Sequence, residues 1–333
     1  MNLFMLGVED KLNDNRIIRL GKMVDWSRFR GMLTGVHKND VDPRGGQKSY
    51  DHLKMLRVLI LKEWHSLSDK ETEESLKVRL DFLVFSGFDL GEATPDETTI
   101  CRFRNALIVK GLDKQIFAEI NSQLENKGLK VKNAQGAVVD ATIIDSSARP
   151  RRIINIEKDR EETQVSFEIE ESKDKDARWL KKGNKSYYGY KGFVVTDTDD
   201  GYILGTKAEP ANVSEMNKLQ EMITGIKAQT IYTDKGYSSQ DNRNILKGKY
   251  KDGIMFKAAR NKPLTGIQKL INRFISKERY IVEQCNGTMK RLFGFTRASY
   301  MTREKVDAQY CFKAVCFNLL KAYNKAAALN YAF

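Results

Sequence analysis

Residues 137–144 read AVVDATII, a short apolar run that is interrupted by a single aspartate, Asp140. An apolar run of this length indicates a buried strand. A carboxylate inside such a strand is costly unless it meets a metal ion, a cation or hydrogen-bond donors. Asp140 is therefore either a structural residue that pairs with an arginine or part of a functional site. Asp145 lies nearby but past the strand, where a local turn role is expected.

The segments that follow predict a sheet of mixed strand direction. YYGYKGFVVTD and GYILGTKA, within 187–208, alternate around the turn TDTDDG and predict a hairpin. QTIYTD (229–234) and GIMFKAA (253–259) predict two more strands, and helical patterns lie at 214–226, 238–248, about 265–293 and about 303–328. Three strands that can pair antiparallel, followed by strands that alternate with helices, favour an RNase H-like α/β core, a mixed sheet with helices on both faces.

Residues 1–128 predict helices only. Ser68 and Glu71 form a capping box, Thr94 with Pro95 and Glu97 predicts another, and Gly128 is a plausible C-cap. The sequence thus predicts a helical N-terminal domain (1–128), which is expected to bind DNA through Arg102 and Arg104, and an RNase H-like catalytic domain (129–333). A charge-rich stretch at about 153–182 is expected to form an exposed insertion, partly extended or disordered.

The charge of the chain favours a polyanionic partner. The net charge is +13, and residues 157–176 alone hold nine acidic and four basic residues, so the remainder carries about +18. Nucleic acid is the simplest such partner, and a merely basic soluble protein is the alternative. The four cysteines show no C-x-x-C pairing, which is typical of reduced thiols in the cytoplasm. No apolar run reaches the ~18 residues of a membrane span.

A helical stripe at 279–291, RYIVEQCNGTMKR, supplies a further carboxylate. Arg279, Glu283 and Lys290 are spaced by four and eleven residues, so they return to within roughly 40° of one another around a helix. Asp234 ends the strand 229–234, at the strand end where α/β sheets bind ligands. Both carboxylates have an alternative role that is structural and not catalytic. Glu283 can form an ion pair with Arg279, and Asp234 can belong to a turn.

Three carboxylates in a basic protein predict phosphodiester chemistry with Mg²⁺, which prefers oxygen ligands. Asp140 would bridge two ions, with Asp234 and Glu283 each completing one side, and Mn²⁺ would be an alternative ion. The nucleophile would be water or a DNA 3′-hydroxyl. The residues expected to contact DNA are Arg279, Lys290, Arg291, Tyr190, Lys191, Lys235, Arg102 and Arg104. For Tyr190 and its neighbours Tyr187 and Tyr188, the alternative is an ordinary aromatic strand.

The chain resembles bacterial insertion-sequence transposases of the DDE type, in the IS-four and IS-five-like group, over nearly its whole length. The segments that carry the resemblance are ATPDETTICRFRNAL (93–107), VVDATIIDSSARP (138–150), ARWLKKGNKSYYGYKGFVVTD (177–197), GTKAEPANVSE (205–215), IYTDKGY (231–237) and Arg279-x₃-Glu283-x₆-Lys290. The last motif usually carries a tyrosine three positions before the arginine, where this chain has Ser276.

The resemblance implies a function and partners. Such enzymes cut at the terminal inverted repeats of their element and join the ends to target DNA, with Mg²⁺ and usually as a dimer in the synaptic complex. The expected location is the bacterial cytoplasm, at the nucleoid during the reaction. A non-catalytic DNA-binding protein derived from a transposase, or a nuclease that only hydrolyses DNA, remains the alternative.

Overall fold

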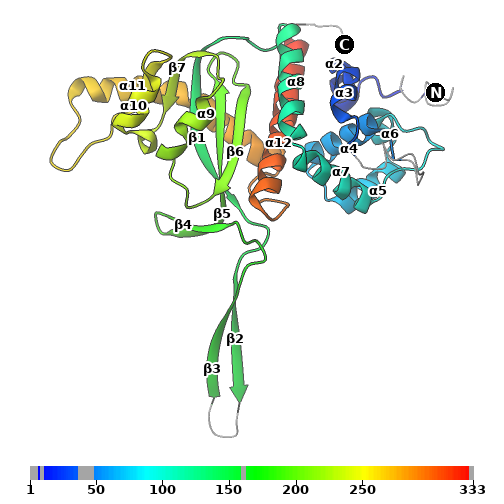
Figure 1. Cartoon of the computed structure of the whole chain (residues 1–333), viewed down its shortest axis with the longest axis horizontal. Coiled ribbons are helices and arrows are strands. Elements are labelled where there is room, and N and C mark those ends of the chain that lie inside the picture. Colours follow the sequence, from blue (N-terminus) through cyan, green and yellow to red (C-terminus); the bar gives the residue numbers. More distant parts are fainter. Residues whose placement is uncertain (1–6, 8–10, 37–48, 159–162, 330–333) are drawn as a thin grey trace.

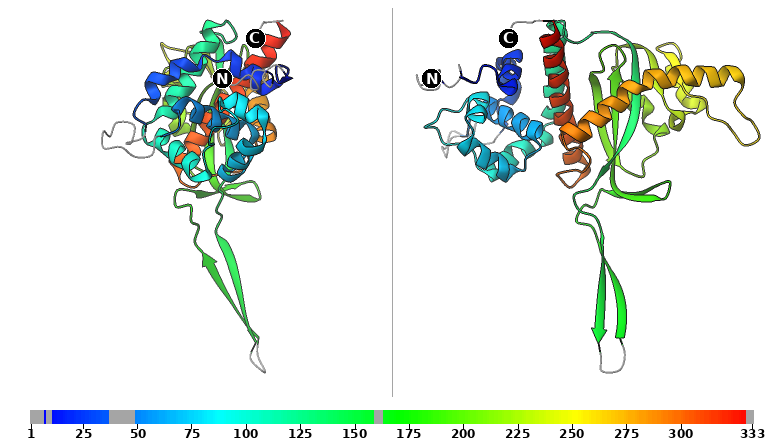
Figure 2. Two further views of the ribbon diagram at one scale, coloured as in Figure 1. Left: turned by 90° about the vertical axis from the view of Figure 1, so that its right-hand side faces the viewer. Right: turned by 180° about the vertical axis from the view of Figure 1, so that it is seen from behind.

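A computed structural model describes residues 7, 11–36, 49–158 and 163–329. The N-terminal helices lie on one side of a central sheet, and a two-stranded arm projects from the end of the sheet (Figures 1 and 2). One long helix, α12, lies between the N-terminal helices and the sheet (Figure 1).

Within 1–128, the residues that the structure describes form helices and no strands, as the sequence predicts. The helices are α2 (Arg16–Met23), η1 (Trp26–Phe29), α3 (Arg30–Leu33), α4 (His52–His65), α5 (Asp69–Val78), α6 (Leu80–Ser86), α7 (Glu97–Val109) and α8 (Leu112–Asn126). Ser68 caps α5 in the predicted capping box with Glu71. The predicted cap at Thr94 is wrong: Asp96 caps α7, and its carboxylate accepts a hydrogen bond from the Thr99 backbone N–H at 2.7 Å.

The sheet has the strand order of an RNase H-like core. Its strands are β1 (Ala134–Asp145), β4 (Arg178–Lys182), β5 (Lys185–Asp197), β6 (Ile203–Pro210), β7 (Ala228–Thr233) and β8 (Lys251–Ile254). The order is β4-β5-β1-β7-β8, and β6 pairs with the other half of β5 on the same side as β4. The β1–β5 and β5–β6 pairs are antiparallel, whereas β1–β7 and β7–β8 are parallel. The predicted α/β fold is confirmed.

Helices cover both faces of the sheet, and the side-chain alternation of β1 explains the two layers. Val138 and Ile144 pack in one apolar core with α11 (Gly266–Leu292) and α12 (Arg303–Ala328). Ala137 and Val139 point the other way, into a second core. The elements on that side are η3 (Met216–Lys218), α9 (Leu219–Ile223), η4 (Lys235–Tyr237) and α10 (Gln240–Leu246).

Helix α12 joins the two parts of the chain in one core. Its buried residues belong to the same apolar cluster as those of the N-terminal helices. Asn318 donates hydrogen bonds both to the Asn121 side chain on α8 and to the Ile203 carbonyl on β6, at 2.8 Å each. The predicted boundary at 128/129 therefore divides the sequence but not the packed core, because α12 packs with the N-terminal helices.

The insertion between β1 and β5 is largely extended. β2 (Arg151–Lys158) and β3 (Thr163–Glu170) pair antiparallel with each other, as the projecting arm. The rest of the insertion returns to the main sheet as β4, which pairs with the first residues of β5. The insertion predicted at 153–182 thus includes one strand of the central sheet.

Candidate active site

Two of the three predicted carboxylates lie next to each other at neighbouring strands. Asp140 is on β1, and Asp234 directly follows β7. Because Val139 and Thr233 are partners in the parallel register of these strands, the two aspartates come at the same level of the sheet. Asp234 also caps η4, where one of its oxygens accepts a hydrogen bond from the Gly236 backbone N–H at 2.8 Å.

Asp140 is held from helix α11 through both of its oxygens. The Arg279 guanidinium lies 3.3 Å from Oδ1, and the Asn286 side-chain amide donates a hydrogen bond to Oδ2 at 3.1 Å. Arg279 and Asn286 are seven residues apart and so lie on one stripe of the helix. The predicted proximity of Arg279 to the carboxylate is observed, while the role of Asn286 was not predicted.

The electrostatics of this pair indicate incompletely compensated negative charge. Burial raises the pKa of Asp140 to about 6; the Arg279 guanidinium opposes this rise, and the Asp234 carboxylate adds to it. Tyr237 is buried beside the pair without a hydrogen-bond partner for its hydroxyl in the described structure. Burial and the charges of Glu215, Asp140 and Asp234 raise the pKa of Tyr237.

Glu283 is on the same stripe of α11 as Arg279 and Asn286, but its side chain is exposed. Among the described residues, no group of three or more carboxylate, histidine or cysteine side chains is positioned to hold a metal ion. The structure therefore brings Asp140 and Asp234 together and leaves Glu283 outside the pair.

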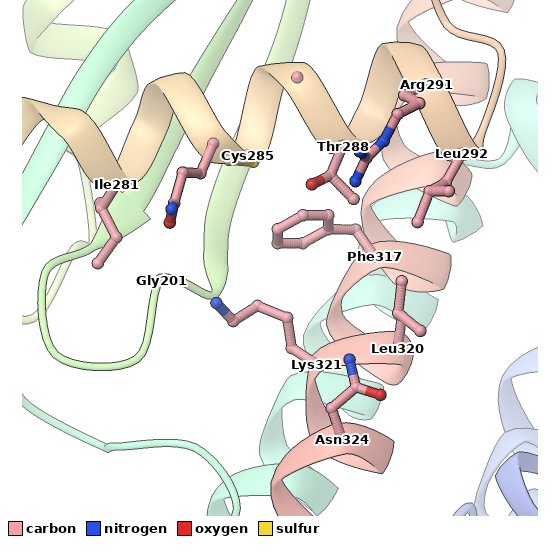
Figure 3. Close-up of a pocket in the computed structure, with 12 residues that line it drawn as sticks. Gly201, Ile281, Cys285, Thr288, Arg291, Leu292, Phe317, Leu320, Lys321 and Asn324 are labelled. Atoms are coloured by element: carbon pink, nitrogen blue, oxygen red, sulfur yellow. The ribbon is translucent and has the colours of Figure 1, made fainter.

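Lys290 lies further along the helix, where the charges of Asp145 and Asp140 act on it. Burial lowers its pKa, and the positive charge of Lys182 on β4 acts in the same direction, whereas Asp145 and Asp140 oppose it. Arg291, the next residue, instead lines a cavity of about 600 Å³ between α11 and α12. Figure 3 shows Arg291 above Phe317 and Lys321 of α12 in this cavity. None of the three predicted carboxylates lines it.

Three of the residues expected to contact DNA are buried, so those predictions are corrected. The Tyr190 hydroxyl donates a hydrogen bond to Asp174 at 2.5 Å, inside the core. Lys191 is also buried and forms an ion pair with Glu215 at 3.3 Å. Strand β5 lies inside the sheet, and its faces contact α11 and α12 on one side and α9 on the other, which explains why both faces of this segment are covered.

Arg104 is the third. It is 5% exposed, pairs with Asp69, and lies 4.2 Å above the ring of Tyr300. Its role is therefore in the contact between the helical part and the loop before α12. Arg102 and Lys235 are exposed, as contact with DNA requires.

A mixed sheet with paired carboxylates at adjacent parallel strands, beside a basic helix, defines the class of RNase H-like enzymes that break and join phosphodiester bonds. Such enzymes use clustered carboxylates to hold divalent cations around the reacting phosphate. Within the described residues, no helix is long and apolar enough to span a bilayer.

Comparison with known proteins names the family. Residues 133–319 match the model of the transposase DDE domain, and residues 7–106 match a transposase domain of the DUF772 type. The chain is 46% identical over 230 residues to the transposase for insertion sequence element IS1106 of Neisseria meningitidis serogroup B, covering 68% of this chain and 78% of the relative. The chain belongs to the DDE transposase family and is a DNA transposase.

A solved structure with a distant similarity is the cryo-EM structure of the piggyBac transposase synaptic complex with hairpin DNA. It shares 10% identity, with a TM-score of 0.45, over 94% of this chain and 74% of that chain.

Proposed function

We propose that this transposase cleaves DNA at the terminal inverted repeats of an insertion sequence and joins the freed ends to target DNA, with Asp140, Asp234 and Glu283 as its catalytic residues. The observation that carries the assignment is the register of β1 and β7, which sets Asp140 beside Asp234. Membership of the DDE transposase family supports the reaction, and the similarity to the transposase of IS1106 supports an insertion sequence as its substrate.

The aspartate pair fits a divalent cation. Two neighbouring carboxylates with one arginine leave net negative charge, and the raised pKa of Asp140 reflects this in part. Asp140 and Asp234 would hold the ion, and Glu283 would join them as α11 adjusts on DNA. Two bound Mg²⁺ ions, or Mn²⁺ in their place, would activate the attacking oxygen and stabilise the leaving oxygen.

The other residues of the site position groups and do no chemistry. Asn286 fixes the rotamer of Asp140 through its hydrogen bond to Oδ2. Arg279 supplies part of the compensating charge and, with Lys290, would contact phosphates beside the cleaved bond. The exposed Lys235 and Arg102 would contact DNA outside the site, and a homodimer would hold two ends together at the nucleoid.

A cleavage assay on the element's own ends tests the proposal. A labelled duplex that contains the inverted repeat and its flanking DNA should be cut at the repeat boundary in Mg²⁺, and the cut end should join a target plasmid. Asp140→Asn and Asp234→Asn should abolish both products while duplex binding persists. Light scattering with and without the duplex tests the dimer.

The outcomes separate the alternatives. Cutting without joining would identify a nuclease that only hydrolyses. Binding without cutting by the unmodified protein would identify a non-catalytic DNA-binding protein. The exposed position of Glu283, outside the aspartate pair, would agree with that outcome. Anomalous scattering from Mn²⁺ soaked into crystals should give peaks beside Asp140 and Asp234, and peaks elsewhere would contradict the metal assignment.

A further inference from the structure

Strand β4 forms a second basic surface beyond the end of β1. β4 pairs with the first residues of β5. Gly189 of β5 pairs with Arg178 of β4 on one side and with Asp145, the last residue of β1, on the other. The turn that joins β4 to β5 therefore extends the sheet beyond the end of β1. Figure 1 shows this hairpin between the body of the sheet and the projecting arm.

Three lysines are gathered at the tip of this hairpin. Lys182 and Lys185 are cross-strand partners, and Lys181 precedes them. All three are exposed, and in the part of the chain that the structure describes none of them forms an ion pair with a carboxylate. Three positive charges this close repel one another, and a polyanion that approaches the tip would relieve the repulsion.

Trp179 on β4 holds a fourth cation in a fixed orientation. The Arg149 guanidinium lies 4.9 Å from the centroid of the Trp179 ring, and the cross-strand partner Tyr188 packs against the same indole at 5.1 Å. Tyr188 is itself fixed, because its hydroxyl donates a hydrogen bond to the Asp174 carbonyl at 3.0 Å. A guanidinium stacked on an aromatic ring keeps its N–H donors free for an anion.

The position of Lys182 connects this surface to the catalytic site. β1 runs from Asp140 to Asp145, which lies level with Arg178 at the start of β4, and β4 continues from there to Lys182. The charges of Lys182 and Asp140 both act on Lys290 of α11. Positive charge thus extends from Lys290, on which Asp140 acts, through Lys182 to the tip of the hairpin. A DNA strand with its scissile phosphate at Asp140 would follow this positive charge in the direction in which β1 ends.

We propose that Arg149, Trp179, Lys181, Lys182 and Lys185, which we call the β4 rim, bind the phosphate backbone of the DNA that leads away from the scissile bond. Trp179 acts through Arg149 as a positioning residue, and the four cations make contacts that do not depend on base sequence. The inference rests on the proposed function, because it takes Asp140 as the site of cleavage. The competing explanation is that these lysines only keep an exposed sheet edge from pairing with another chain.

The test compares two triple variants of the full-length protein. Lys181→Ala/Lys182→Ala/Lys185→Ala removes the rim lysines. Lys247→Ala/Lys249→Ala/Lys251→Ala removes the same charge from exposed lysines at the start of β8, at the opposite end of the parallel strands. The probe is a fluorescein-labelled duplex of arbitrary sequence, and fluorescence anisotropy gives Kd at a series of NaCl concentrations. Thermal unfolding shows that both variants are folded.

The rim variant should bind the duplex about tenfold more weakly or worse. The plot of log K against log salt should become less steep. The magnitude of its slope should decrease by about two to three, because each phosphate that the variant no longer neutralises contributes about 0.9. The control variant should stay within about twofold of the unmodified protein. Equal effects in the two variants would overturn the rim while leaving the proposed function intact. If the rim variant had a lower oligomeric state and an unchanged affinity for DNA, the rim would be an interface between proteins, and its proposed role in DNA binding would be wrong.

Failure of the unmodified protein to bind any duplex at low salt would count against the proposed function itself.

A double-mutant cycle tests the role of Trp179. Because Trp179 acts through Arg149, Trp179→Ala, Arg149→Ala and the double variant should all weaken binding by a similar factor, and Trp179→Phe should restore part of it. Additive losses would contradict the positioning role.

Discussion

Asn286 on α11 donates a hydrogen bond to Oδ2 of Asp140 on β1 at 3.1 Å, across the junction of the helix and the sheet. Arg279, two turns earlier, contacts Oδ1 of the same carboxylate. The rotamer of Asp140 is therefore set by how α11 docks on the sheet. Any displacement of the helix would move the hydrogen-bond partners of the aspartate together with Glu283.

Asp140→Asn should stabilise the protein at neutral pH when metal is removed with EDTA. Because the pKa of Asp140 is raised from 3.8 to about 6 by folding, the folded state holds its proton more tightly, and stability falls as pH rises between these values. The variant should be more stable by about 1–3 kcal/mol at pH 7.5, with the difference vanishing near pH 4. Thermal unfolding at several pH values measures this. Asp145→Asn, on the exposed neighbour, should change nothing, and a destabilised Asp140→Asn would contradict the prediction.

Arg279→Gln should shift the acid limb of the pH–rate profile to higher pH. The Arg279 guanidinium lowers the pKa of Asp140, so its loss leaves the carboxylate protonated at higher pH. Arg279→Lys keeps the positive charge and should keep most of the original midpoint. Cleavage rates in Mg²⁺ across the pH range measure both variants, and an unchanged midpoint in Arg279→Gln would show that Asp140 does not control this limb.

Glu283→Gln should abolish cleavage and spare DNA binding, since it removes a charge and almost no volume. A loss of more than about 100-fold is expected for a group that acts on the reacting phosphate. Glu278→Gln is the matched control, because it makes the same change on another face of α11. Cleavage assays and anisotropy on the same duplex separate the two effects. Cleavage by Glu283→Gln at the rate of the unmodified protein would reject Glu283 as the third carboxylate.

Arg102 and Arg104 should give opposite results although they are two residues apart. Arg102 is exposed, so Arg102→Ala should weaken binding to the element ends and leave stability unchanged. Arg104 is buried with Asp69 and Tyr300, so Arg104→Ala should destabilise the fold by on the order of 3 kcal/mol. Anisotropy and chemical unfolding of both variants check this. Normal stability of Arg104→Ala would contradict its structural role.

Glu63→Gln should destabilise the protein strongly. Glu63 is buried with Lys313, 3.2 Å away, and Lys62; burial opposes its ionisation, but the two lysines lower its pKa. The variant removes the carboxylate from Lys313 and leaves Lys62 with Asp69 at 3.6 Å, which costs about 3–5 kcal/mol. Because folding lowers the pKa of Glu63, its ionised carboxylate stabilises the folded state above pH 4.5, and this stabilisation is lost as pH falls. In Glu63→Gln, the free energy of unfolding should therefore lack this part of its dependence on acid pH. Glu73→Gln, in the surface ion pair with Lys77, should change the free energy of unfolding far less than Glu63→Gln.

The sequence predicts the strands and helices well because each carries a local pattern. The apolar run around Asp140, the alternation in β6 and the capping box at Ser68 are all local signals, and the structure contains the elements they predict. The sequence favours Thr94 as the cap of α7 because two residues near the start of this helix can cap it, and only the backbone geometry selects Asp96.

The site was less predictable, because its residues meet only through tertiary packing. Tyr190 and Lys191 look like one aromatic and one basic residue of a surface strand. Their burial follows from the helices that pack on both faces of β5, which no local pattern reveals. Asn286 could have been found, since it falls on the helical stripe of Arg279. The exposed position of Glu283 had no signal in the sequence.

The packing of α12 has a consequence for how the protein is made. The N-terminal helices emerge first from the ribosome, yet their core is completed by residues 303–328, at the opposite end of the sequence. Contacts so distant along the chain form late, after the whole sheet has been synthesised. A nascent or prematurely terminated chain would therefore expose the apolar surface of α4 and α8 without a finished fold.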